Sequence, residues 1–140
     1  MTTGRVVAIL LVFLVFGPAL GAVAIGILGT LSLPFLPAQL PRGFSAALAV
    51  ALMLPVSYMA GGMQALIAGG VTTLALKRGR SPWLPVLVVA ALSAIGFVFY
   101  AGMFDESAPA FIVAHVVSAA ACLGICAPFG LLLPSPPASA

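Results

Sequence analysis

Residues 6–33 read VVAILLVFLVFGPALGAVAIGILGTLSL, an uncharged run that decides the class of fold. A transmembrane helix needs about 20 consecutive apolar residues to cross about 30 Å of hydrocarbon, and this run is longer than that. Three further uncharged runs follow at 44–76, 82–104 and 109–133. The sequence therefore predicts an all-α, polytopic integral membrane protein in which four transmembrane helices form one bundle.

The composition of the whole chain supports the same class. Hydrophobic residues make up 64% of the 140 positions and charged residues only 5%, whereas soluble domains carry about 25% charged residues. Such a chain cannot cover a water-facing surface, so the outside of the bundle must face a lipid bilayer. Its few basic residues are too scattered for a nucleic-acid-binding patch. We expect one transmembrane domain over 1–133 and a short Pro/Ser/Ala-rich tail at 134–140.

The charged residues lie outside the apolar runs and predict the orientation of the bundle. Cytoplasmic loops of membrane proteins carry an excess of Lys and Arg. Arg5 precedes the first run and the basic segment 77–80 follows the second, while Asp105 and Glu106 separate the third from the fourth; Arg42 is the one exception. We expect both termini to be cytoplasmic. The Ala-, Gly- and Pro-rich composition without Asn suggests a bacterial protein, and hence the inner (plasma) membrane.

The first run has a second interpretation. Its basic start at Arg5, its short apolar core and the helix-breaking pair Gly17 and Pro18 are also typical of a secretory signal peptide. However, the apolar run continues well beyond the small residues at 22–24 where cleavage would occur. A transmembrane helix is therefore the favoured interpretation.

The second run, 44–76, is longer than one upright span requires and contains Pro55. Excess length is absorbed by tilt or by a kink at proline, so we expect one long helix. The alternative is a pair of shorter segments around a re-entrant turn. Such a turn would have to be buried in protein, because exposed backbone in lipid is too costly.

Small residues recur at four-residue spacing along the predicted helices. In lipid the hydrophobic effect does not drive helices together, so close packing of small residues takes its place. We predict that the following positions face other helices: Gly17, Gly21, Gly61, Ala65, Gly69, Ser118 and Cys122. Packing within the bundle is the favoured interpretation, and an oligomerisation face is the alternative.

Three polar side chains inside the predicted spans are candidate functional positions: Tyr58, Gln64 and His115. Tyr58 and Gln64 flank a glycine pair in the run that Pro55 weakens, and transporters expose backbone groups at such broken helices. An imidazole in hydrocarbon is costly and needs a partner, a cavity or a function. We expect His115 to be neutral and hydrogen-bonded to a polar side chain. The candidates are Ser57, Tyr58, Gln64, Ser93, Tyr100 and Ser118. A position near the outer interface is the alternative.

His115, Ser118, Cys122 and Cys126 form one stripe of the fourth predicted helix. Imidazole and thiolate groups bind metals, but His115 and Cys126 would be about 16 Å apart along a straight helix. Haem ligation is also disfavoured, because this is the only histidine of the chain. Two cysteines four residues apart on a helix rarely reach disulfide geometry. We therefore predict no metal site and no cofactor.

The chemistry of the runs disfavours an enzyme. They contain no Asp or Glu, no nucleophile–base pair and no phosphate-binding glycine loop, so we predict no catalytic residue. Two functional hypotheses follow. The first is an accessory or structural subunit that packs against other subunits of a larger membrane complex. The alternative is a small homo-oligomeric channel or carrier for a small solute, lined by residues 58–64 and His115.

Overall fold

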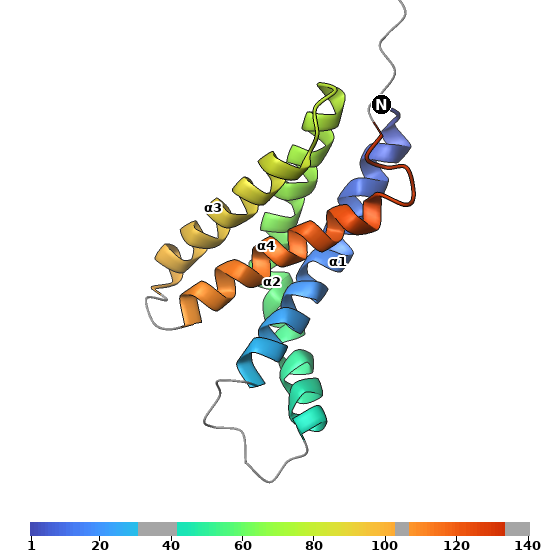
Figure 1. Ribbon diagram of the computed structural model, residues 1–140. Helices are drawn as coiled ribbons and strands as arrows, with labels where there is room; N and C mark the ends of the chain where they lie inside the picture. The colour runs from blue at the N-terminus through green and yellow to red at the C-terminus, as the bar shows by residue number, and fades with distance from the viewer. Residues whose placement is uncertain (31–41, 103–106, 134–140) are drawn as a thin grey trace, which may run out of the picture.

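The computed structural model describes residues 1–30, 42–102 and 107–133, and all regular elements in these ranges are helices. They are α1 (Thr3–Thr30), α2 (Arg42–Lys77), α3 (Trp83–Ala101) and α4 (Ser107–Cys126) (Figure 1). The prediction of an all-α fold is confirmed for this part of the chain. The predicted helix ends at 33 and 104 and the predicted tail at 134–140 lie outside the described residues, as do Asp105 and Glu106.

Three stretches of the described chain are long and apolar enough to cross a membrane: Thr3–Ala24, Trp83–Ala101 and Ala108–Cys126. They belong to α1, α3 and α4, and they indicate a helical membrane protein. The fourth predicted span, in α2, is not among them. α2 is nevertheless one continuous helix that includes Pro55, so its predicted continuity is confirmed.

α1 also continues through a proline. Pro18 lacks a backbone N–H and so leaves the carbonyl of Leu14 without its helical donor, yet Thr3–Thr30 is one continuous helix. Neighbouring helices bind other carbonyls of this turn: the Tyr58 hydroxyl of α2 donates to Val15, and the Ser118 hydroxyl of α4 donates to Gly17. The interpretation of Gly17 and Pro18 as a helix break is therefore wrong.

The predicted end of the fourth helix at 133 is also wrong, because α4 ends at Cys126. Pro128 disfavours helical backbone at the residue before it, and residues 127–133 form turns in which Gly130 has a positive φ of 66°. Arg5 holds this segment against α1. Its Nε and Nη2 atoms donate to the Leu131 carbonyl at 2.9 and 2.7 Å, and Nη2 also donates to the carbonyl of Leu133.

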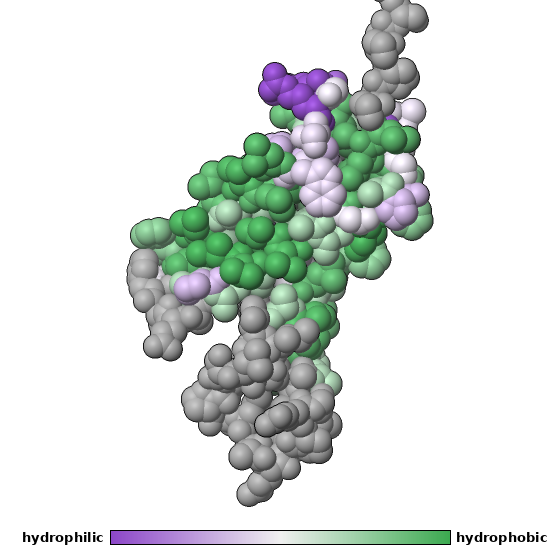
Figure 2. Space-filling model, viewed as in Figure 1, coloured by the Kyte–Doolittle hydropathy of each residue, from purple (hydrophilic) through white to green (hydrophobic). Residues whose placement is uncertain are grey.

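The helices run alternately up and down, and α1 packs against α2 and α4 while α3 packs against α2 and α4 (Figure 1). The largest buried side chains of the core are Phe13, Ile9, Leu76, Leu123 and Val86. The start of α1, the turn between α2 and α3, and residues 127–133 lie at the same end of the bundle. The hydrophilic surface in Figure 2 gathers at this end, where the basic turn 77–80 is exposed.

Candidate functional site

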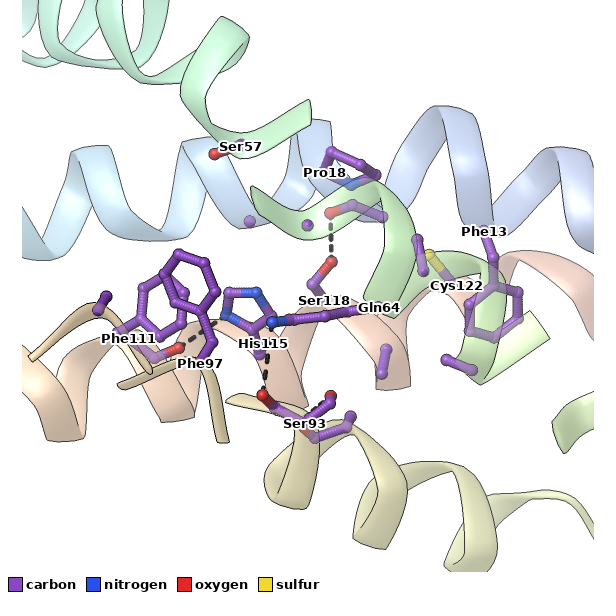
Figure 3. A pocket seen from close by; sticks show the side chains of 18 residues that line it. Phe13, Pro18, Ser57, Gln64, Ser93, Phe97, Phe111, His115, Ser118 and Cys122 are labelled. Carbon is purple, nitrogen blue, oxygen red and sulfur yellow. Dashed lines mark hydrogen bonds between the residues drawn. The ribbon is translucent and has the colours of Figure 1, made fainter. Parts of the chain in front are cut away.

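A cavity of about 300 Å³ lies among the four helices. Every helix contributes to its lining, which consists mostly of glycine, alanine and phenylalanine. The polar side chains at the cavity are Ser57, Gln64, Ser93, His115 and Ser118 (Figure 3). Two of the three candidate functional residues, Gln64 and His115, are thus brought together by helices that are far apart in sequence.

Glycines create much of this space. Gly21 is buried and lines the cavity, yet a Cβ atom added to it would meet no heavy atom within 4 Å. A Cβ atom added to Gly61 would lie 3.9 Å from His115 Nε2 and 3.9 Å from Pro18 Cβ. A side chain at either position would therefore extend into the cavity. The cavity stays open because glycine has only a hydrogen atom in place of a side chain.

The other small residues bring α1 close to α2. A Cβ atom added to Gly17 would lie 3.3 Å from Ala65 Cβ, and one added to Gly69 would lie 3.1 Å from Leu10 Cδ2. Of the seven predicted packing positions, Gly17 is half-buried and the other six are buried: Gly21, Gly61, Ala65, Gly69, Ser118 and Cys122. All seven lie inside this single chain, so they do not need a second copy to cover them.

His115 is oriented by its own helix. Its Nδ1 atom lies 3.0 Å from the carbonyl oxygen of Phe111. A carbonyl only accepts hydrogen bonds, so in the neutral ring the proton is on Nδ1 and Nε2 is left as an acceptor. The observed partner is a backbone group and not the polar side chain that we expect from the sequence. The Phe111 ring lies against the imidazole at a centroid distance of 4.2 Å, and Phe97 stacks on Phe111 at 5.2 Å.

Only one end of the Gln64 side-chain amide is hydrogen-bonded. Its Nε2 atom donates to the carbonyl of Ser93 over a long 3.5 Å, and the Ser93 hydroxyl donates to Ala90 in its own helix. The Gln64 Oε1 atom is buried and has no hydrogen-bond partner in the described part of the chain. Exchanging the two ends of the amide would not help, because the oxygen would then face the Ser93 carbonyl.

Tyr58 does not belong to the cavity. The residue is 40% exposed, and its hydroxyl donates to the Val15 carbonyl. The structure therefore separates Tyr58 from Gln64 and His115, although the three were predicted together. Phe97 and Phe111, which support the imidazole, were not among the predicted positions. Their proximity depends on how α3 packs against α4, and no sequence spacing reveals that contact.

The two cysteines of α4, Cys122 and Cys126, are unbonded and buried. Within residues 1–30, 42–102 and 107–133, no three His, Cys, Asp or Glu side chains are close enough to share a metal ion. What the cavity offers chemically is an apolar space lined by Gln64 and His115, of which Gln64 Oε1 and His115 Nε2 are hydrogen-bond acceptors.

No protein-family model, curated protein or solved structure matches this chain.

Proposed function

We propose that this chain is a small membrane protein that binds a small, largely apolar molecule inside its helix bundle. This narrows the second of the two functional hypotheses, a small homo-oligomeric channel or carrier, to a single chain that holds a small solute in its own bundle. The observation that supports it is the cavity of about 300 Å³ among the four helices. Ligand pockets are typically mostly apolar, with a few convergent polar groups, and begin at about this volume. Gln64 and His115 supply those groups.

The ligand should be neutral. The described residues of the cavity lining include no Asp, Glu, Lys or Arg, and a buried charge without a counter-charge costs several kcal/mol. A small apolar molecule partitions into a bilayer without help, so the cavity serves to hold the ligand and not to make a pore. We assign no catalytic role, because the Ser118 hydroxyl, the closest nucleophile to His115 along α4, donates to the Gly17 carbonyl instead of the imidazole.

We further propose that α2 is the fourth crossing and that both termini face the cytoplasm of a bacterial inner membrane. The antiparallel course of α1 and α2 supports this, because α2 returns the chain to the end of the bundle where α1 begins (Figure 1). That end carries Arg5 and the exposed basic turn 77–80. An excess of basic residues favours the cytoplasmic side.

The binding proposal is tested with naphthalene. A dry cavity of about 150 Å³ binds benzene, so a cavity twice that size suits a two-ring molecule. The protein in lipid nanodiscs is unfolded by heat with and without naphthalene. A thiol-reactive dye reports unfolding, since Cys122 and Cys126 are buried in the folded state. Ligand binding to the folded state raises the unfolding midpoint.

Two leucine variants make the test specific. Gly21→Leu fills the cavity, whereas Gly96→Leu adds the same side chain at an exposed glycine of α3 with no heavy atom within 4 Å of the added Cβ. Naphthalene should stabilise the wild type and Gly96→Leu but not Gly21→Leu. The proposal fails if naphthalene leaves the wild-type midpoint unchanged, or if it stabilises Gly21→Leu equally.

The accessory-subunit hypothesis remains a second candidate, and one surface feature favours it. A Cβ atom added to Gly62 or Gly70 of α2 would have no heavy atom of the described residues within 4 Å, and Met63 and Leu66 beside them are exposed. Such glycines admit a second helix closely. Purification in mild detergent and mass spectrometry should then find a partner chain that Gly62→Leu removes. Identical co-purifying chains with wild type and variant would refute this candidate.

A further inference from the structure

The cavity lining brings two acceptors together, and no described residue of the lining donates a hydrogen bond to either of them. Gln64 Oε1 is buried and has no hydrogen-bond partner among the described residues. The Nε2 atom of His115 is an acceptor because Nδ1 donates to the Phe111 carbonyl, and it has no partner in the described part of the chain. The hydroxyls of Ser93 and Ser118 are engaged by the backbone carbonyls of Ala90 and Gly17. They do not supply the missing donors, and the hydroxyl of Ser57, which also lines the cavity, lies apart from Gln64 and His115 (Figure 3).

An orphaned acceptor is costly in this environment. Leaving a buried polar group unsatisfied costs about 1–3 kcal/mol, and the hydrocarbon core of a bilayer holds no water to compensate. An occupant that donates a hydrogen bond recovers this energy, whereas an occupant with only acceptors or no polar atom does not. The two acceptors therefore select among molecules of the same size and shape.

We propose that the ligand is a neutral, largely apolar molecule that carries a hydroxyl or N–H group and donates it to Gln64 Oε1 or His115 Nε2. This inference rests on the proposed function, since it specifies the occupant of the same cavity. Carboxylates are excluded, because they would face two acceptors without a cation in the lining. The aromatic groups beside His115, Phe97 and Phe111, favour a ligand with a planar ring that packs against them.

Three probes of equal ring size separate the possibilities. Naphthalene has no polar atom, 2-methoxynaphthalene has an acceptor but no donor, and 2-naphthol has a donor. Binding to the protein in nanodiscs is measured by equilibrium dialysis, and partition into protein-free nanodiscs is subtracted. A net hydrogen bond changes affinity about 3- to 10-fold, so 2-naphthol should bind that much more tightly than 2-methoxynaphthalene.

Variants of the acceptors test where the donor is bound. Gln64→Met and His115→Phe each replace one acceptor by an apolar side chain of similar size. At least one of them should abolish the preference for 2-naphthol while naphthalene still binds. Tyr58→Phe is the matched control, because Tyr58 lies outside the cavity lining, and it should keep the preference unchanged.

Each outcome has a distinct meaning. If none of the three probes binds, the proposed function itself is wrong. If all bind with equal affinity, the cavity binds ligands but the requirement for a donor is refuted. If 2-naphthol is preferred in wild type and equally in both Gln64→Met and His115→Phe, the donor is bound elsewhere and the assignment of the two acceptors is refuted.

Discussion

The contact between α1 and α2 makes a quantitative prediction at two adjacent glycines of α2. A Cβ atom added to Gly69 would lie 3.1 Å from Leu10 Cδ2, 3.4 Å from Phe13 Cβ and 3.6 Å from Leu10 Cα, whereas one added to Gly70 would meet nothing within 4 Å. Gly69→Leu must therefore push α1 away from α2. Gly70→Leu places the same side chain toward open space and is the matched control.

The magnitude follows from two terms. Replacing glycine by leucine in a helix interior stabilises the helix by about 0.8–1 kcal/mol, and this gain is common to both variants. Overpacking a close contact costs about 1–3 kcal/mol, and only Gly69→Leu incurs it. Because the common gain cancels, Gly69→Leu should be less stable than Gly70→Leu by about 1–3 kcal/mol.

The free energy of unfolding is measured in mixed micelles by titration with a denaturing detergent, with helical circular dichroism as the signal. A Gly69→Leu variant that is more stable than Gly70→Leu, or that loses no stability relative to the wild type, would refute the packing of α1 on α2. Equal losses in both variants would mean that the outer face of α2 is as closely packed as the inner face.

Three further predictions concern hydrogen bonds and topology. Tyr58→Phe and Ser118→Ala should each lower the free energy of unfolding by about 0.6 kcal/mol, the average for a hydrogen bond between membrane helices. Losses above about 2 kcal/mol in unfolding titrations would show that these hydroxyls do more than bind α1. Arg5→Gln should speed hydrogen exchange in residues 127–133, because the guanidinium donates to a carbonyl there. The same change at the exposed Arg80 should leave exchange in this segment unchanged. Equal exchange rates in the two variants would contradict the role of Arg5 in holding residues 127–133. Ser81→Cys should react with an impermeant thiol reagent only from the cytoplasmic side, and labelling of intact cells from outside would reverse the topology.

The sequence predicts the helical class well because the signal is strong. Uncharged runs of this length have few structures available other than membrane helices, so α1, α3 and α4 follow directly. The boundaries were less well predicted, since apolar composition does not reveal where a helix stops. At α4 the stop signal was present in the sequence as Pro128, but the apolar run continues past it.

The candidate site could be predicted only in part. Gln64 and His115 stand out because polar groups in lipid are costly, whatever the fold. Their meeting at one cavity depends on how α1 and α3 each pack against both α2 and α4, which no spacing in the sequence encodes. The partner of Tyr58 was equally hidden, because it is the backbone carbonyl of Val15, and every residue of a chain offers such a carbonyl.

The occupancy of the cavity is tested most directly by nuclear Overhauser contacts between 2-naphthol and alanine methyl groups of the protein in nanodiscs. The lining includes Ala65, Ala90 and Ala119 from three helices, whereas Ala75 is buried but lies outside it. Binding in the cavity predicts contacts from the ligand ring to the three lining methyls and none to Ala75. Contacts confined to lipid, or absent from all three lining alanines, would contradict a ligand-binding function for this bundle.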